Sequence, residues 1–152
     1  MLKVLTYDAE FERRAGERDF VVLVPFAPAQ ADTARSLVAA GAALSIKTMV
    51  GRTLRFEAVA APEFEAQLVA RDAGAVLVPS GTQAEQAKGW AAAATRHQRY
   101  TITLEEELVK VGILLGVALN GGKPQVILNA TTARAIKAEF NSAVMRVARI
   151  QQ

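Results

Sequence analysis

Hydrophobic residues along the chain fall into short continuous runs, which are separated by longer stretches with helical spacing. Phe20–Phe26 is an apolar run rich in valine, which is typical of a strand covered on both faces, as in a parallel sheet. Thr53–Val59 alternates apolar and charged residues, which indicates a half-buried strand. The same reasoning predicts three further short strands, at Lys3–Tyr7, Ala75–Val78 and Tyr100–Thr103.

Helix signals lie between these runs. We expect Pro28 and Asp32 to open a helix that continues to about Ala40 and stops at Gly41, because glycine often ends helices. The charged segment Ala9–Asp19 is predicted to be a solvated loop or a single surface turn of helix.

A second helix is predicted to begin around Pro62 and to continue to about Asp72. Its buried stripe should consist of Phe64, Leu68 and Val69. The segment Ala42–Val50 is open to two interpretations, a helix end or a loop, and Gly51-Arg52 ends it.

The turn Pro79–Thr82 introduces a third helix, which should continue to about Arg96. Two capping boxes compete for its start, Ser80 with Gln83 and Thr82 with Glu85. A third box, Thr103 with Glu106, precedes a short helix at Glu105–Val109. The alanines expected on one face of the long helix are Ala84, Ala87, Ala91 and Ala94.

A hairpin is predicted near the end of the chain. The apolar runs Gly112–Leu119 and Gln125–Asn129 flank Asn120-Gly121-Gly122, and Asn120-Gly121 is a strong signal for a tight turn. Asn129 is expected to cap the helix that follows, Thr131–Glu139. A break near Asn141-Ser142 should start another helical piece.

Strands that alternate with helices predict an α/β fold built from βαβ units. We therefore expect one domain over residues 1–152, a Rossmann-like three-layer α/β/α sandwich. Its sheet should be mostly parallel, with a C-terminal antiparallel hairpin.

Composition narrows the class of protein. About half of the residues are apolar (51%), so a full core is possible without disulfides. The chain has no cysteine, which excludes thiolate chemistry. Its net charge is only +3 and the basic residues are dispersed, so nucleic-acid binding is not expected. The apolar runs are too short for a membrane span, and no signal peptide is visible, so the protein is either cytoplasmic or a trimmed mature chain.

Catalytic motifs are missing from the expected places. Ser80 follows a strand, but a nucleophile elbow needs glycine two residues on either side, where Val78 and Thr82 stand. Glu105, Glu106 and Glu107 are consecutive, so on a helix their side chains point in different directions and cannot converge on a metal ion. They suit the first turn of a helix, where the helix dipole is positive. No glycine-rich nucleotide motif occurs. We expect no cofactor and no metal; the remaining candidate is a small-anion site at the backbone of Ser80, Gly81 and Thr82.

Trp90 lies among alanines and is either a core anchor or an exposed marker of a partner surface. His97 is expected at a helix end, near the negative pole of the helix dipole.

The end of the chain resembles the YfiR-like family of periplasmic proteins. That family tends to finish with an apolar strand, a short turn, a strand ending in asparagine, an Ala/Arg helix and a Phe-x-x-x-Leu-x-x-Leu-Ala pattern. The matching segments here are Gly112–Leu119, Asn120–Lys123, Gln125–Asn129, Thr131–Glu139 and Phe140–Ile150. Leu5–Asp8, Arg14–Gly16, Gly51–Thr53 and Val78–Gly81 are similar in position, so the resemblance spans nearly the whole chain.

The chain also departs from the family pattern, because it lacks the aromatic-rich first helix and the cysteines of better-known members. It resembles a divergent branch. The resemblance implies a non-enzymatic periplasmic regulator, similar to repressors that bind the periplasmic domain of a membrane diguanylate cyclase. Such a repressor lowers cyclic di-GMP synthesis and biofilm formation through protein–protein contact.

Two other classes stay open. One is a small periplasmic solute-binding domain, with its ligand at the strand-end loops Pro25–Ala31 and Pro79–Thr82. The other is a cytoplasmic enzyme whose chemistry the sequence does not reveal.

A partner surface or homodimer contact is expected to include Trp90, Phe140, Arg146 and Arg149. Helical spacing near the C-terminus gathers apolar residues on one face, with four basic residues largely off it. The apolar set is Ala133, Ile136, Phe140, Val144 and Val147, and the basic set is Arg134, Lys137, Arg146 and Arg149. This face either joins the partner surface or simply covers the sheet.

Overall fold

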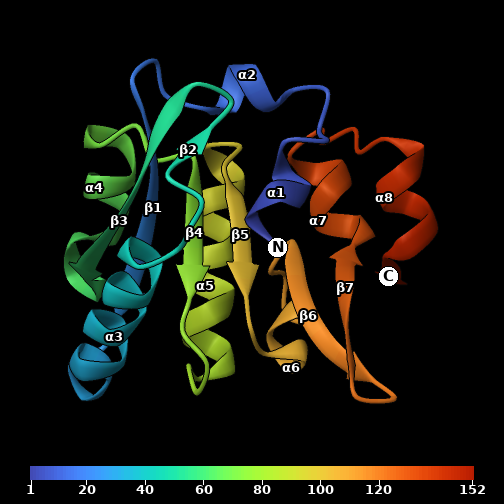
Figure 1. The fold of residues 1–152 in the computed structure, drawn as a ribbon. Helices are drawn as coiled ribbons and strands as arrows, with labels where there is room; N and C mark the ends of the chain where they lie inside the picture. The colour runs from blue at the N-terminus through green and yellow to red at the C-terminus, as the bar shows by residue number, and fades with distance from the viewer.

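A single mixed sheet of eight strands organises the computed structural model, which describes all 152 residues (Figure 1). The strand order is β2-β3-β1-β4-β5-β6-β7-β8. In chain order the strands are β1 (Asp19–Phe26), β2 (Thr48–Met49), β3 (Arg52–Ala60), β4 (Ala75–Val78), β5 (Tyr100–Thr103), β6 (Leu115–Asn120), β7 (Lys123–Asn129) and β8 (Arg149–Gln151).

The five central strands, β3, β1, β4, β5 and β6, are parallel. β2 and β7 run antiparallel to their neighbours β3 and β6, and β8 is parallel to β7. The predicted fold class is confirmed: an α/β fold with a mostly parallel sheet and a C-terminal antiparallel hairpin.

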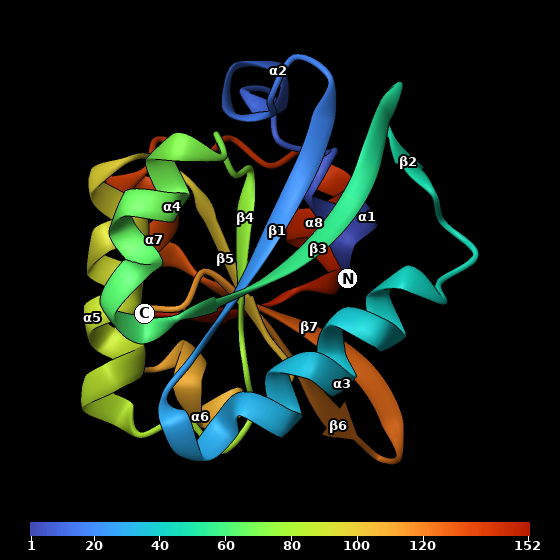
Figure 2. The same ribbon diagram turned by 90° about the vertical axis from the view of Figure 1, so that its left-hand side faces the viewer.

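Helices cover both faces of the sheet (Figure 2). α4 and α5 lie on one face, whereas α3, α1 and α8 lie on the other. The helical segments are α1 (Leu2–Leu5), α2 (Phe11–Arg14), η1 (Pro28–Gln30), α3 (Ala31–Ala42), η2 (Ala61–Glu63), α4 (Phe64–Ala70), α5 (Ala84–Arg96), α6 (Glu106–Val109), α7 (Ala130–Ala135) and α8 (Ser142–Val147). No helix is long and apolar enough to cross a membrane.

The core consists of two large layers, one on each side of the sheet. Alternate residues of β1 supply both layers: Phe20 and Val22 face the α3 side, and Val21 and Leu23 face the α4 side. Double-sided burial is the reason that this strand is apolar throughout, as its sequence indicated.

The predicted strand Lys3–Tyr7 is wrong, because this segment forms α1 and the turn that follows it. Both edges of β1 are paired, one with β3 and the other with β4, so no position beside β1 is open to a further strand. The segment instead buries Leu5 in the layer on the α3 side. The charged stretch after it contains one helical turn, α2, which was one of the two alternatives predicted. The turn is not a purely surface element, because Phe11 and Arg14 are buried.

Gly41 does not end a helix, contrary to the prediction, because α3 continues through it to Ala42. A Cβ at this position would lie 2.4 Å from the ring of Phe56 on β3. The glycine is therefore needed where helix and sheet approach closely. The predicted buried stripe of α4 is wrong at one position, since Val69 is exposed whereas Phe64 and Leu68 are buried.

None of the three predicted capping boxes forms. α5 begins after Gln83, whose side chain makes no capping bond, and the Thr82 hydroxyl donates instead to the carbonyl of Pro79. At the third site, Thr103 accepts a bond from the amide of Glu105, two residues on. The hydroxyls thus stabilise the turns that follow the strands and do not cap the helices.

The C-terminal hairpin is present, but its turn is one residue later than predicted. Asn120 pairs with Lys123, so Gly121 and Gly122 are the two central residues, at φ of 59° and 80°. Two glycines take this positive-φ pair without a Cβ penalty. In the undecided segment before β3, Val50 and Gly51 make a second turn with positive φ, between β2 and β3.

A buried ionic cluster joins three distant parts of the chain. The Asp8 carboxylate accepts bonds from Arg14 Nε at 3.0 Å and from the Tyr100 hydroxyl at 2.6 Å, and all three side chains are buried. Asp8 also accepts from the backbone amides of Glu10 and Glu139. The cluster thereby connects the N-terminal segment, β5 and the link between α7 and α8.

The cluster also shifts two pKa values. Burial raises the pKa of Asp8, but hydrogen bonds from Tyr100, from two backbone amides and from Arg14 outweigh it, and the net pKa lies below the ordinary value. Burial, followed by the hydrogen bond to Asp8 and its charge, raises the pKa of Tyr100. Asp8 is therefore the anion and Tyr100 the neutral donor at neutral pH.

Two asparagine caps allow a matched test. The Asn129 side chain accepts from Thr132 N at 3.0 Å and donates to the carbonyl of Val109 at 2.7 Å, so the predicted cap is confirmed and has a second, buried bond. Asn141 caps α8 but is exposed. We expect Asn141→Ala to lower the free energy of unfolding by about 1 kcal/mol. Asn129→Ala should cost about 2–3 kcal/mol, because it also leaves buried groups unpaired. Urea denaturation measures both, and equal losses would contradict this ranking.

Asp8→Asn should lower the free energy of unfolding at pH 7 by about 3–5 kcal/mol, because it leaves the Arg14 charge buried without a counter-ion. The folded-state pKa of Asp8 is below its ordinary value of 3.8, so its stabilisation is complete above about pH 5. It is lost as the pH falls through that lower pKa. Urea unfolding from pH 7 to pH 3 should show a shallower acid loss in Asp8→Asn than in the parent. Asp32→Asn, which removes an exposed pair with Arg35, is the control and should change stability by less than about 1 kcal/mol. Parallel acid profiles for the parent and Asp8→Asn would contradict the role of Asp8.

Candidate functional site

The topology places a switch point between β1 and β4. These strands are neighbours, but the chain leaves β1 for α3 on one face and leaves β4 for α5 on the other (Figure 2). In open α/β sheets, ligands bind outside the carboxyl ends of the strands at such a point. The two predicted loops, Pro25–Ala31 and Pro79–Thr82, follow these two strands. Gln30 Nε2 donates to Thr82 Oγ1 at 3.1 Å, so the loops lie side by side.

The predicted anion site at Ser80, Gly81 and Thr82 already holds a carboxylate of the same chain. The Gly81 amide donates to Glu105 Oε2 at 2.7 Å. Ser80 is exposed, whereas Thr82 is buried and bonded to Pro79. A free anion would have to displace Glu105. This glutamate lies at the start of α6, as predicted, and its side chain also ties the loops after β4 and β5 together.

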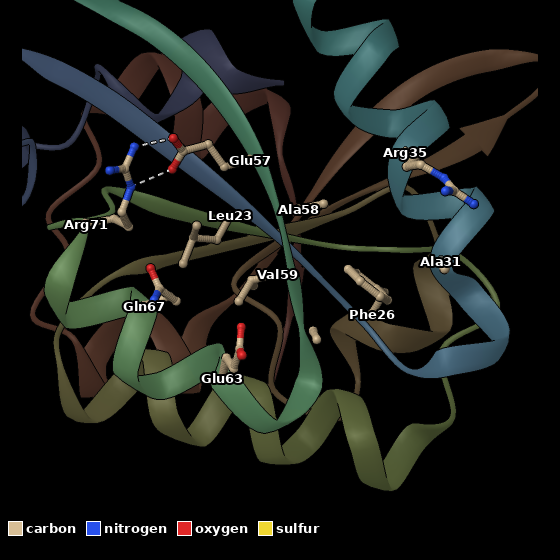
Figure 3. Close-up of a pocket in the computed structure, with 11 residues that line it drawn as sticks. Leu23, Phe26, Ala31, Arg35, Glu57, Ala58, Val59, Glu63, Gln67 and Arg71 are labelled. Atoms are coloured by element: carbon tan, nitrogen blue, oxygen red, sulfur yellow. Dashed lines mark hydrogen bonds and ion pairs between the residues drawn. The ribbon is translucent and has the colours of Figure 1, made fainter.

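The largest hollow at this edge lies beside β3, next to the first loop, with a volume of about 700 Å³ (Figure 3). We call it the strand-end hollow. Its lining residues are Leu23, Phe26, Ala31, Arg35, Glu57, Ala58, Val59, Ala60, Glu63, Gln67 and Arg71. They fall on both sides of β3: Phe26, Ala31 and Arg35 lie on one side, and Glu63, Gln67 and Arg71 on the other. No residue of Pro79–Thr82 lines it.

Polar groups of both signs surround the strand-end hollow. Arg71 Nε donates to Glu57 Oε2 at 2.8 Å, and a second guanidinium nitrogen contacts Oε1, so the pair is bidentate (Figure 3). These bonds and the charge of Glu57 raise the pKa of Arg71. Arg35 pairs with Asp32, whereas Glu63 has no ion-pair partner. Leu23, Phe26 and Val59 add an apolar wall, so the hollow suits a solute with polar and apolar parts.

Sequence reasoning missed these polar residues. Glu57 occupies a polar position of an alternating strand, and Arg71 stands at the end of the following helix. Neither belongs to a motif. Only the pairing of strand and helix in space brings them together, so the sequence carries no local signal for them. Nowhere in the structure do three or more His, Asp or Glu side chains gather closely enough to hold a metal ion.

The four predicted interface residues do not form one surface. Trp90 is only 3% exposed and packs against Phe64 under α5, so it is a core anchor and its assignment to an interface was wrong. Phe140 is half-buried and pairs with Asp8 as an isolated bridge. Arg146 is exposed on α8, and Arg149 lies on β8, where it pairs with Glu106.

The predicted apolar face of the C-terminal segment is interrupted. Lys137 adopts a φ of 59°, so α7 ends at Ala135 and the helical spacing does not continue into α8. Ala133, Ile136 and Val144 are buried against the sheet, whereas Val147 is 67% exposed. Most of this face therefore covers the sheet. His97 does lie at a helix end, the C-cap of α5, where it contacts Glu65.

Comparison with known proteins shows the fold alone. No protein-family model and no curated protein matches the chain. Three solved structures match at TM-scores of 0.62 to 0.65 and 13% to 16% identity, over 94% to 97% of this chain. The chain spans about three fifths of the length of each of them (57% to 60%).

The three structures come from bacteria. One is a conserved domain protein from Vibrio cholerae (15% identity, TM-score 0.62), and another is an ABC domain in complex with L-Trp from Streptococcus pneumonia (13%, 0.62). The third is the ligand-free, open structure of a substrate-binding protein with adhesive properties from Clostridium difficile (16%, 0.65). The chain thus shares its α/β fold with these three structures.

Proposed function

We propose that the chain is a non-enzymatic, periplasmic binding domain that takes a small solute in the strand-end hollow. The observation that carries this proposal is the position of the hollow at the carboxyl ends of β1 and β3, beside the loop that reaches the switch point. The similarity to solved substrate-binding proteins supports the same class of function. It favours the solute-binding alternative over regulation by protein contact.

The chemistry of the strand-end hollow indicates the class of solute. Glu63 offers a carboxylate without an ion-pair partner, which suits an ammonium group. The guanidinium group of Arg71, on the same side of β3, keeps free N–H donors after pairing because it has five, and these suit a carboxylate. Leu23 and Val59, also on this side, provide apolar contact. A small amino acid has all three parts, and one structural neighbour was solved in complex with L-Trp.

A thermal-shift screen of the free amino acids, followed by calorimetric titration of any that raise the melting temperature, tests this function. We expect Glu63→Gln to weaken binding of the best solute at least tenfold, because a charge-assisted hydrogen bond contributes about 1.5–3 kcal/mol. Glu65→Gln is the matched control, since Glu65 lies only two residues further along, in the first turn of α4, but pairs with Arg96 outside the hollow. Absence of any stabilising solute, or equal effects of the two variants, would contradict the proposal.

A second candidate function, regulation by protein contact, is favoured by the C-terminal surface. Met145 and Val147 on α8 are exposed apolar residues, and Arg146 lies between them in the sequence. β8 is the last strand of the sheet, so its outer edge has unpaired backbone groups to which another chain can bind. The resemblance to the YfiR-like family suggests the partner: the periplasmic domain of a membrane diguanylate cyclase, or a second copy of this chain. Cyclic di-GMP synthesis and biofilm formation would then be the processes controlled.

Arg146→Glu tests this second function. If α8 contacts a partner, reversing an exposed charge there should weaken the complex several-fold without loss of stability. A pull-down from membranes identifies partner proteins, and sedimentation detects a homodimer. Arg134→Glu, an exposed and unpaired position on α7, is the control. A strict monomer that retains no membrane partner, or equal effects of both variants, would exclude this candidate.

A further inference from the structure

A second hollow lies on the α3 side of the sheet and shares no lining residue with the strand-end hollow. It runs between α3 and α1, over β4 and β5, and we call it the apolar groove. Ten of its twelve lining residues are hydrophobic, and its volume is about 320 Å³. Leu77 and Ile102 are its buried lining residues, and Leu44, Ile46 and Leu104 are lining residues at its exposed rim.

The groove exists because the helices on this side do not meet. α3 packs over β3 and β1, and α1 is only four residues long, so no helix crosses in front of the lower parts of β4 and β5 (Figure 1). Large apolar side chains consequently reach solvent at the rim: Leu104 is 55% exposed, and Leu44 and Ile46 are exposed as well. Contiguous apolar surface of this kind commonly marks a binding site.

The volume of the groove indicates the size of a ligand that it can hold. Leu77 and Ile102 are only 8% and 2% exposed, so they form its floor. A volume of about 320 Å³ matches a slim chain of roughly ten to twelve heavy atoms, at about 30 Å³ each, the volume of a water molecule.

The charge beside the groove indicates which polar group the ligand should carry. Lys3 is the only charged residue that lines the groove, it is exposed, and no carboxylate lies within ion-pair distance of its ammonium group. No acidic residue lines the groove. The groove therefore combines an apolar lining with an exposed lysine side chain that has no ion-pair partner.

We propose that the apolar groove binds a medium-chain amphipathic carboxylate, with its hydrocarbon chain over Leu77, Ile102 and Leu104 and its carboxylate at Lys3. Burial of the chain supplies most of the affinity. The lysine adds preference for an anion over a neutral analogue of the same length.

Calorimetric titration with decanoate and with its methyl ester tests this site. Decanoate should bind with one-to-one stoichiometry. Leu104→Asp, which places an acid in the apolar lining at the rim, should weaken decanoate binding at least tenfold. Leu119→Asp is the matched control, because Leu119 is an exposed strand leucine that does not line the groove, and it should leave binding unchanged. Lys3→Glu should weaken decanoate binding at least fivefold and change binding of the ester less than twofold.

A second variant and three alternative outcomes test the same site. If Leu104→Asp does not fold, Ala40→Trp fills the groove from an exposed position on α3 and should abolish binding. Equal decanoate affinity in Leu104→Asp and Leu119→Asp would overturn the proposal. So would sedimentation showing a dimer that Leu104→Asp dissociates, which would assign the groove to a second copy. Decanoate binding that Glu63→Gln weakens and Leu104→Asp does not would move the ligand to the strand-end hollow.

Discussion

The carboxylate of Asp8 is the interaction on which the two ends of the chain depend. It lies in the interior, and removal of a charge from water costs far more than one hydrogen bond returns. Four donors therefore surround it, from Arg14, Tyr100 and the amides of Glu10 and Glu139. Two backbone bonds reinforce this connection, from Ala9 to Glu139 and from Asn141 to Tyr7. Segments that begin and end the sequence are thus held together by one satisfied charge.

Local pattern predicted the parts of the fold in which burial alone decides the conformation. β1, β4 and β5 were recognised because their apolar runs match their double-sided burial. The prediction for Lys3–Tyr7 failed because a short apolar segment fits a helix or a strand equally well, and the available space on the sheet decides. The turn after β6 shifted by one residue because Asn-Gly and Gly-Gly both tolerate positive φ.

The candidate sites were less predictable than the fold. The two loops after β1 and β4 were located because topology alone places strand ends at one edge. Glu57 and Arg71 were missed because their pairing joins a strand to a helix and leaves no motif in the sequence. Trp90 had two alternative interpretations, a core anchor or an exposed interface residue, and its alanine-rich surroundings in the sequence fit both. The Gly81 amide does bind a carboxylate, but that carboxylate belongs to Glu105 of the same chain, so a site for a free anion there stays a prediction.

Gly41 has a consequence for how the apolar groove works. The absence of a side chain lets α3 rest directly on the Phe56 ring, so the spacing between helix and sheet is fixed by two rigid groups in contact. One wall of the groove is therefore preformed. A ligand that packs against this wall does not have to order it on binding, which lowers the entropic cost of association. A Cβ at this position would push α3 away from the sheet and widen the groove, so the absence of that one atom sets the groove's width.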